Sequence, residues 1–443
     1  MKRTDAIVIV VLAAIVAIVW AAKHRDVIDD DSPDYIIAAE NLAEGRGMLS
    51  RPSPAAPEAW RSEARVAVTR LSELQGDVEA TRTPGYPLFL ALARLAGLTP
   101  RGATYVQHAL HVALIGAFVV FARRVGAGRG ATITASLWLI VEPYGRWAAN
   151  HIVSETLFSV AVFAIVWLVA EREMSYGRAA LIGALCGAAT LIRPIAVLYC
   201  IPVAFVGVRR VSAASKAVLT HRTPRWAMAA LLVVCAVAPP AAWAARNANR
   251  TGIFTLSLIV PINRLFYTAA GAEAATMPGR FADNLERVRA GERVRLATMI
   301  AERETALHRP LTPAEKLRVV NALANDMLLH HPGGAVLHAA RDVRALLLLT
   351  YRCNACGTLR NRAKDVLLGI HIAILVLAIL GIIVQRDRAL AFLFALTILY
   401  FICIGAGSGG SWGRFRVPVE PYYALCAAMG GEAVLQRLRR RAA

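Results

Sequence analysis

The stretch "AIVIVVLAAIVAIVWAA", residues 6–22, decides the class of this protein. It is an unbroken apolar run, and a helix of about 20 such residues crosses a hydrocarbon core about 30 Å thick. A short basic start, "MKRTD", precedes it. A cleaved signal peptide has a similar pattern, but no convincing small-residue cleavage site stands before the polar segment that follows. We therefore interpret residues 1–22 as a first transmembrane helix.

The rest of the chain is equally apolar, with 57% hydrophobic and only 18% charged residues among 443. A soluble chain of this length would carry more charge. Nine further apolar segments of roughly membrane-crossing length follow the first. The composition thus predicts an all-α integral membrane protein, a bundle of about ten transmembrane helices. The nine segments are 103–123, 131–147, 153–170, 178–192, 194–208, 226–244, 366–384, 389–406 and 417–435.

The short connections between these segments are rich in Arg and Lys. They read "ARRVGAGRG", "EREMSYGR", "RRVSAASKAVLTHRTPRW", "QRDR" and the tail "QRLRRRAA". Such loops stay in the cytoplasm, which places both termini there and fits a bacterial inner membrane protein. Because much of the formal charge of +20 lies in these short connections between apolar segments, nucleic acid is not the expected partner.

Two long segments then face the periplasm and divide the chain into five parts. Residues 23–101 form the first periplasmic segment, and residues 246–365 form the second, which reads as mostly helical. Residues 102–245 hold helices two to seven, and residues 366–443 hold the last three helices and the basic tail. We expect interfacial helices in both periplasmic segments.

The first periplasmic segment opens with "VIDDDSPDYIIAAENLAEGRG", residues 27–47. Four carboxylates, Asp29, Asp30, Asp31 and Asp34, fall within six positions. Such a cluster at a helix end is usually a solvated cap. After it, apolar residues recur with helical spacing as far as Gly45, which predicts a short helix along the interface.

Other polar residues stand at the outer ends of distant spans. If the helices bundle, these ends meet the carboxylates in one outward cavity. A pocket that contains both carboxylate and guanidinium groups suits a site that binds a phosphate and activates a hydroxyl. The residues concerned are Arg82, His151, Glu155, Arg193, Arg246, Arg414 and Arg416.

Five stretches, in order along almost the whole chain, also resemble one family. They are "DDDSPDYIIAAENLAEGRG … TRTPGYPLFLAL", "VSETLFSVAVF", "GAATLIRPIAVL", "WAARNANRTGIFTLS" and "GRFRVPVEPYYALCAA". The family is the GT-C glycosyltransferases, in the branch of the protein O-mannosyltransferases and the lipid A aminoarabinose transferase. We expect no large C-terminal soluble domain of the kind that some relatives carry, which leaves the class of acceptor open.

The resemblance implies a GT-C-like bundle that moves a sugar, with inversion, from a polyprenyl-phosphate donor to an acceptor on the outer face. In the family, an Asp four residues before a Tyr is the proposed base. Here these are Asp31 and Tyr35, although Asp30 and Asp34 compete for the role. Relatives often carry an acid directly after the base, where this chain has Ser32. A carboxylate can accept the acceptor's proton as the new bond forms.

The departing phosphate needs cationic partners, because developing charge in a partly dry site is stabilised by prearranged donors. The resemblance puts Arg82 first, at the position of a phosphate-binding Lys or Arg. The other candidates for the phosphate are Arg246, Arg416, Arg193 and Tyr86. Each of these arginines could instead extend its side chain to the membrane–water interface. Tyr86 could instead be one of the aromatic residues that are common at that interface.

The resemblance places a second active-site acid at Glu155, which would bind the acceptor or the sugar, or orient a basic residue. An ionisable residue at the start of a span is costly unless it is paired or wet. We expect Tyr35, His151 and Arg414 to contact substrate. No metal and no cofactor are demanded; the lipid-linked sugar is a substrate, and the partners are membrane lipids and a glycan, lipid or protein acceptor.

Two alternatives remain. A transporter or flippase of lipid-linked sugars would also need an outward cavity, but it would carry charged or broken helices near the middle of the membrane.

Cys353 and Cys356, in "YRCNAC", form either a local disulfide or free thiols, and without a second ligand pair they do not indicate zinc.

Overall fold

The structure is a computed structural model. It describes residues 3–60, 78–171, 174–210, 224–348, 361–407 and 413–442. Within these ranges the regular secondary structure is entirely helical, apart from one isolated antiparallel bridge between Leu49 and Val78. The predicted all-α class is confirmed. Cys353 and Cys356 lie outside the described residues.

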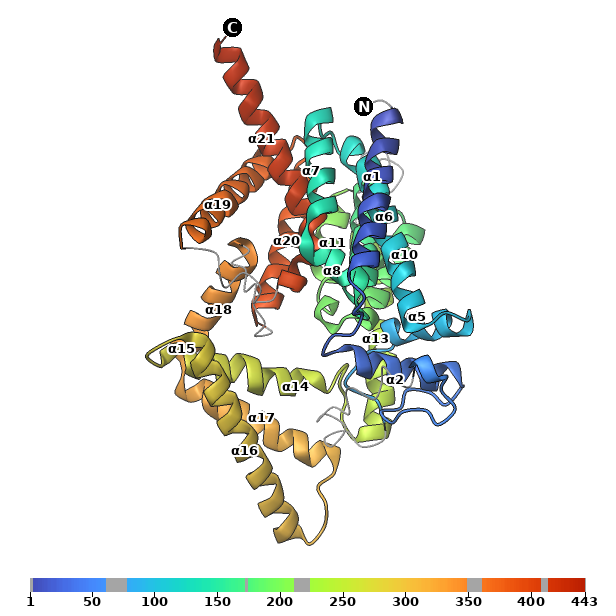
Figure 1. The fold of residues 1–443 in the computed structure, drawn as a ribbon, viewed down its shortest axis with the longest axis vertical. Helices are drawn as coiled ribbons and strands as arrows, with labels where there is room; N and C mark the ends of the chain where they lie inside the picture. The colour runs from blue at the N-terminus through green and yellow to red at the C-terminus, as the bar shows by residue number, and fades with distance from the viewer. Residues whose placement is uncertain are drawn as a thin grey trace.

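One end of the molecule is a bundle of apolar helices, and both described ends of the chain lie at its far end (Figure 1). The bundle contains α1 (Arg3–Lys23), α6 (Pro100–Arg124), α7 (Arg129–Val141), α8 (Pro143–Asn150), α9 (Glu155–Glu171), α10 (Tyr176–Ile192), η1 (Pro194–Ala196), α11 (Cys200–Arg209), α13 (Pro224–Thr251), α19 (Asn361–Val384), α20 (Arg388–Gly407), η4 (Gly413–Val419) and α21 (Glu420–Ala442). A continuous core of buried apolar side chains holds it together.

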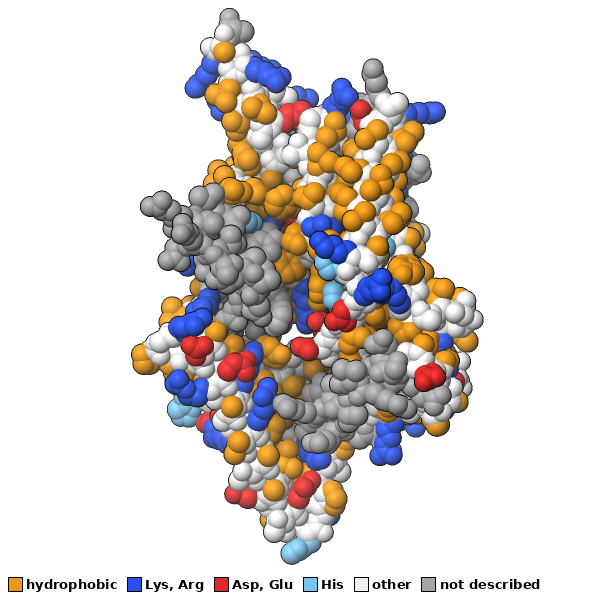
Figure 2. Space-filling model, viewed as in Figure 1, with side chains coloured by type: hydrophobic (Ala, Val, Ile, Leu, Met, Phe, Trp, Pro, Cys, Tyr) orange, Lys and Arg blue, Asp and Glu red, His pale blue; other side chains and the backbone are white. Residues whose placement is uncertain are grey.

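Four of these helices are long and apolar enough to cross a membrane: α1, α6, α13 and α20. Ile7, Ile15 and Ile18 of α1 are exposed. Hydrophobic side chains cover much of the visible face of the bundle (Figure 2). Apolar side chains are exposed in this way when lipid, and not water, surrounds them. The chain is a multi-pass membrane protein. Four of the other expected spans, 131–147, 178–192, 194–208 and 366–384, correspond to shorter apolar helices, and 153–170 lies in a bent pair of helices. The segment 417–435 lies mostly in α21, which does not meet the same criterion, so the count of ten stays a prediction.

The segment 131–147, expected as one span, is interrupted. Helix α7 ends at Val141, and α8 starts at Pro143, whose ring cannot continue the preceding helix. The Glu142 side chain accepts from the backbone N–H groups of Tyr144 and Gly145 and so caps α8. Helices α8 and α9 are then bent by 118° relative to each other.

The opposite end of the molecule is a smaller helical unit from the second long segment (Figure 1). It contains α14 (Ile259–Asn263), the π-helix η2 (Arg264–Ala269), α15 (Ala270–Thr276), α16 (Phe281–Leu307), α17 (Pro313–His330) and α18 (Pro332–Leu348). Thr312 and Glu315 form a capping box at the start of α17. The unit has its own buried core, including Leu265, Leu285 and Val320.

Helices α2 (Ser32–Ala43) and α5 (Gly85–Leu95) pack against each other between these two parts. Nearly every residue of α2 is buried, and Ile36 lies in one apolar cluster with Tyr86, Leu90 and Ile152. Gly45 follows α2 with a φ of 72°, a left-handed conformation that glycine adopts without strain. The predicted short helix and its end at Gly45 are therefore present, and the helix fixes the acidic residues just before it.

Candidate functional site

The acidic cluster is held by the hydroxyl of Ser32. This Oγ donates to the carbonyl oxygen of Ile152 at 2.9 Å and accepts from the backbone N–H of Asp29 at 2.8 Å. The backbone N–H of Ile152 in turn donates to the carbonyl of Val27 at 2.8 Å. Two segments far apart in sequence are thereby joined, and the loop that carries Asp29 and Asp31 is fixed against the start of α9.

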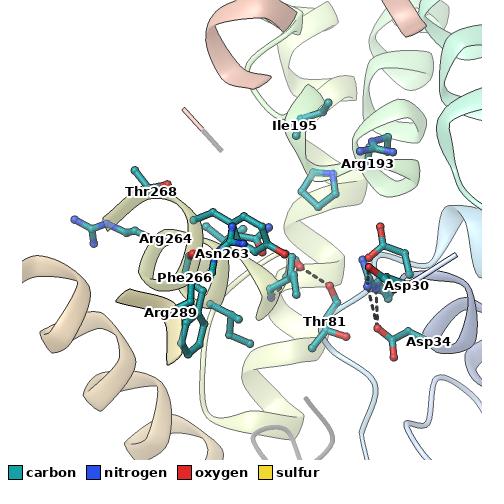
Figure 3. Close-up of a pocket in the computed structure, with 18 of the residues that line it drawn as sticks. Asp30, Asp34, Thr81, Arg193, Ile195, Asn263, Arg264, Phe266, Thr268 and Arg289 are labelled. Atoms are coloured by element: carbon teal, nitrogen blue, oxygen red, sulfur yellow. Dashed lines mark hydrogen bonds and ion pairs between the residues drawn. The ribbon is translucent and has the colours of Figure 1, made fainter. Parts of the chain in front are cut away.

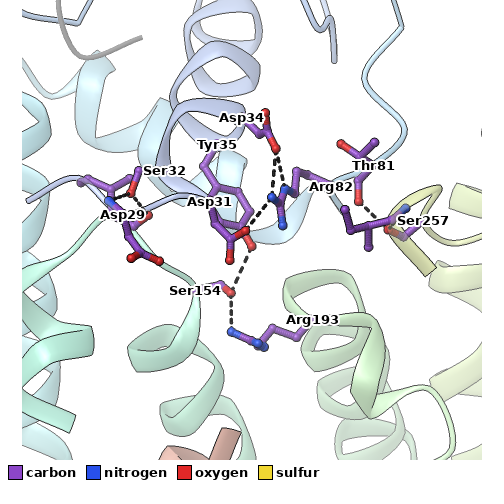
Figure 4. A network of polar contacts seen from close by, with 12 residues as sticks. Asp29, Asp31, Ser32, Asp34, Tyr35, Thr81, Arg82, Ser154, Arg193 and Ser257 are labelled. Carbon is purple, nitrogen blue, oxygen red and sulfur yellow. Dashed lines mark hydrogen bonds and ion pairs between the residues drawn. The ribbon is translucent and has the colours of Figure 1, made fainter. Parts of the chain in front are cut away.

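Arg82 lies between two of the carboxylates (Figure 4). Its Nη2 is 2.8 Å from Oδ1 of Asp31 and 2.9 Å from Oδ2 of Asp34, and its Nε donates to the same Asp34 oxygen at 3.1 Å. Its guanidinium also lies 5.0 Å from the centre of the Tyr35 ring. The backbone N–H of Arg82 donates to the buried carboxylate of Glu79 at 2.8 Å, which holds this turn of the chain in place.

Arg414 reaches the other side of the same cluster from η4. Its Nη2 is 3.0 Å from Oδ2 of Asp31, and its Nη1 is 3.2 Å from Oδ2 of Asp29. Its Nε is 3.7 Å from Oε1 of Glu155. Arg193, at the end of α10, makes a closer ion pair with that Glu155 oxygen, at 2.6 Å. Asp31 is therefore held by guanidinium groups from two distant segments.

Two hydroxyl groups extend the network. Nη1 of Arg193 donates to Oγ of Ser154 at 3.1 Å, and Ser154 Oγ lies 3.4 Å from the hydroxyl of Tyr35 (Figure 4). Glu155 is only 2% exposed, so its charge is compensated inside the protein and not by water. The predicted meeting of carboxylates and guanidinium groups from distant helix ends is present.

The charges set the acidity of the cluster. Burial by itself raises the pKa of the Asp31 carboxyl, but Arg82 and Arg414 outweigh it and hold that pKa well below its ordinary value. The pKa of Asp29 is raised, mainly by burial and only partly offset by Arg414. Burial likewise raises the pKa of Glu79. Of Asp29, Asp31 and Glu79, only Asp31 has its pKa lowered and is thereby held in its ionised form.

A cavity of about 1240 Å³ opens next to this cluster (Figure 3). It is lined on one side by all four cluster carboxylates, with Tyr35, Arg82, Arg193 and Arg414. On the other side it is lined by α14, η2 and α16 of the smaller unit. Thr81 and Ser257 connect the two sides, because Ser257 Oγ donates to the Thr81 carbonyl.

Five of the predicted site residues lie outside the lining of this cavity. Glu155 lies behind Arg193 and Arg414. The hydroxyl of Tyr86 is buried and donates to the side chain of Gln107 at 2.7 Å. Nδ1 of His151 lies 2.8 Å from the carbonyl of Trp147, and the two rings are stacked. The other two residues are Arg246 and Arg416.

Arg246 and Arg416 direct their guanidinium groups elsewhere. Arg246 donates to the carbonyls of Glu79 at 2.8 Å and of Met48 at 3.0 Å, so it holds the first long segment. Arg416 is 1% exposed and forms an ion pair of 2.5 Å with Glu420, four residues along the chain. Neither is placed to touch a ligand in the cavity.

Ser154 and Glu79 were not predicted as site residues, nor were three arginines on the cavity's other side, Arg264, Arg289 and Arg293, and Ser32 was noted only as the residue that stands where relatives carry an acid. The "DSPD" and "VSET" stretches gave a signal for the serines, since each stands beside a predicted acid. No local pattern marked Arg264 or Arg293, because only the fold brings α14, η2 and α16 to face the acidic cluster.

No protein-family model matches the chain, and no curated protein matches it. Among solved structures, the chain is similar to the archaeal oligosaccharyltransferase AglB from Archaeoglobus fulgidus, in complex with an inhibitory peptide and a dolichol-phosphate. The identity is 11% and the TM-score 0.47, over 99% of this chain and 51% of that one. The chain thus spans about half the length of the archaeal enzyme.

The chain is also similar to ArnT from Cupriavidus metallidurans bound to undecaprenyl phosphate. Here the identity is 15% and the TM-score 0.38, over 97% of this chain and 78% of that one. Both neighbours are GT-C glycosyltransferases, the class that the sequence resemblance names. At TM-scores below 0.5 the likeness carries no argument about function, which has to come from the residues of the site.

Proposed function

We propose that this protein is an inverting glycosyltransferase that moves a sugar from a polyprenyl-phosphate donor to an acceptor hydroxyl on the periplasmic face of the membrane. The observation that supports it best is the position of Asp31. Its carboxylate lies in a large outward cavity, within 3.0 Å of Arg82 and of Arg414. A base and cationic groups that suit a phosphate are thereby side by side.

In the proposed reaction, the acceptor oxygen attacks the anomeric carbon while the bond from that carbon to the phosphate oxygen breaks. The acceptor proton passes to Asp31, and the electron pair leaves with the lipid phosphate. Because Arg82 and Arg414 lower its pKa, Asp31 is a weak base. It serves here because the hydroxyl becomes acidic as its oxygen bonds to carbon, so the proton leaves late.

Arg193 is the best-placed partner for the departing phosphate. It lines the cavity, and of its side-chain nitrogen atoms only Nη1 makes a hydrogen bond or ion pair within the described residues, to Ser154 and Glu155. The side-chain Nε and Nη2 remain for a ligand. Arg82 would share the charge, and an arginine's planar fork suits a phosphate. We assign Glu155 to orienting Arg193 and Arg414, since its carboxylate touches both.

The test is the consumption of polyprenyl-phosphate-linked sugars by the purified full chain. Asp31→Asn should reduce turnover by about 10²–10⁴-fold, the usual contribution of a general base, while binding of undecaprenyl phosphate is kept. Asp26→Asn is the matched control, because Asp26 is an exposed carboxylate of the same segment outside the cavity lining. Full turnover in Asp31→Asn would refute the base. Donor that crosses the membrane unconsumed would favour a transporter.

A further inference from the structure

The wall of the cavity that faces the acidic cluster is basic. Arg264 from η2 and Arg289 and Arg293 from α16 line it, and Figure 3 shows Arg264 and Arg289 on one side with Asp30 and Asp34 on the other. We call Arg264, Arg289 and Arg293, with the apolar residues between them, the basic wall. The cavity therefore has two sides of opposite charge.

Two charges of the basic wall are not neutralised by the protein. Arg289 pairs with Glu286 at 3.0 Å, as Arg295 on another face of α16 pairs with Glu292. Arg264 and Arg293, in contrast, have no acid three or four residues away in the sequence. Neither makes an ion pair within the part of the chain that the structure describes. A cation that faces a cavity without a counter-ion attracts an anionic ligand.

The basic wall also contains exposed apolar side chains. Val260 and Val294 line the cavity with 52% and 68% of their surface exposed, and Ile300 lines it further along α16. Val294 and Ile300 belong to α16, a helix whose sequence is rich in charged residues. Exposed apolar residues between unpaired arginines suit an amphiphile, whose tail covers the valines while its anionic head meets the guanidinium groups.

From this we infer that the basic wall binds the acceptor, and that the acceptor is a lipid carrying a phosphate. This inference rests on the proposed function, because it assumes that the hydroxyl of the same molecule reaches Asp31. Arg82 and Arg193, on the side of the carboxylates, are assigned to the donor's phosphate, so the acceptor's phosphate is placed at Arg264 and Arg293 on the opposite side. The acceptor is thereby oriented across the cavity, with its hydroxyl toward Asp31.

The experiment measures lipid binding to the full chain purified in dodecyl maltoside. The probe for the basic wall is dodecyl phosphate, which differs from the detergent only in its head group, and the probe for the donor side is undecaprenyl phosphate. The test variant is Arg264→Gln with Arg293→Gln. Its matched control, Arg287→Gln with Arg303→Gln, removes two exposed charges of α16 outside the cavity lining.

Wild type and control should bind dodecyl phosphate in the presence of saturating undecaprenyl phosphate. The test variant should bind dodecyl phosphate about tenfold more weakly, with its affinity for undecaprenyl phosphate within about twofold of wild type. Replacing both arginines by Lys should restore most of the binding, since charge is kept. That Lys variant also keeps the inference testable if the Gln variant folds poorly.

Unchanged binding of dodecyl phosphate in the test variant would overturn the inference. The inference would also be overturned if the test variant lost binding of undecaprenyl phosphate and kept binding of dodecyl phosphate, because the basic wall would then hold the donor's phosphate. Both results leave the proposed function standing. That function fails separately, if wild type neither binds undecaprenyl phosphate nor consumes a lipid-linked sugar.

Discussion

The ion pair between Arg193 and Glu155 gives the sharpest test of how the site is assembled. The two side chains meet at 2.6 Å with 14% and 2% of their surface exposed. At an effective dielectric constant of about 20, two unit charges at this distance attract by about 6 kcal/mol. Part of this offsets the loss of hydration of both groups, and Arg414 at 3.7 Å supplies a second, weaker counter-charge to Glu155.

We therefore expect each single variant, Arg193→Gln and Glu155→Gln, to destabilise the protein by about 3 kcal/mol. The double variant should cost clearly less than the sum, with a coupling energy of about 2 kcal/mol, because neither charge is then left buried alone. The assay is reversible unfolding of the full chain in mixed micelles, followed by helical circular dichroism. Arg193→Gln should also weaken binding of undecaprenyl phosphate.

The control is the ion pair between Arg124 and Glu171 at the opposite end of the bundle. Its side chains are 53% and 29% exposed, so its coupling energy should stay below about 1 kcal/mol. Additive effects of Arg193→Gln and Glu155→Gln would refute the reasoning. They would mean that Glu155 is not an anion compensated by Arg193, and its role in orienting both arginines would be lost.

Four other outcomes follow from particular contacts. Gly381→Ala should lower the free energy of unfolding by about 1–3 kcal/mol, because its Cβ would overlap the carbonyl oxygen of Cys426, whereas Gly369→Ala, with open space around it, should not. Arg246→Met should cost about 2 kcal/mol in thermal unfolding and expose the first long segment to proteases, since two hydrogen bonds to its carbonyls are lost. Adding a chelator should leave turnover unchanged, because Arg82 and Arg414 already supply positive charge to the carboxylates; loss restored by Mg²⁺ or Mn²⁺ would contradict this. Turnover should stay level from pH 7 to about pH 5, because a base whose pKa is lowered is ionised throughout this range; a fall within it would point to Asp29, whose pKa is raised.

Much of the site could be predicted from polar residues at the outer ends of apolar segments. Asp31, Arg82 and Arg414 converge as expected, because in a bundle the ends of distant helices meet. The direction of each side chain could not be predicted in the same way. Arg246 also stands at the predicted outer end of an apolar segment, yet it donates hydrogen bonds to two backbone carbonyls that the fold brings beside it. Position along a span indicates height in the membrane, but it does not indicate which neighbour an Arg meets.

Arg414 and Arg416 show how local geometry separates two arginines that look equivalent. They lie two positions apart in η4, a helix with three residues per turn, so their side chains point in directions about 120° apart. Only one of them can face the cavity. Glu420, four residues after Arg416, offers that arginine a partner and so settles which one turns away. Helix type was the missing information, because "GRFRVPVE" gives no sign of a tight turn before α21.

Asp31 illustrates the same limit for the proposed base itself. It occupies the N-cap position of α2, where an Asp normally accepts a hydrogen bond from a backbone N–H of the first turn. No such bond forms here. Pro33, in the first turn, has no N–H to donate, and Ser32 uses its hydroxyl to fix the loop to Ile152. The helix start therefore leaves the Asp31 carboxylate available to Arg82 and Arg414. A local rule predicts a cap at this position, and the two distant guanidinium groups make it part of the site.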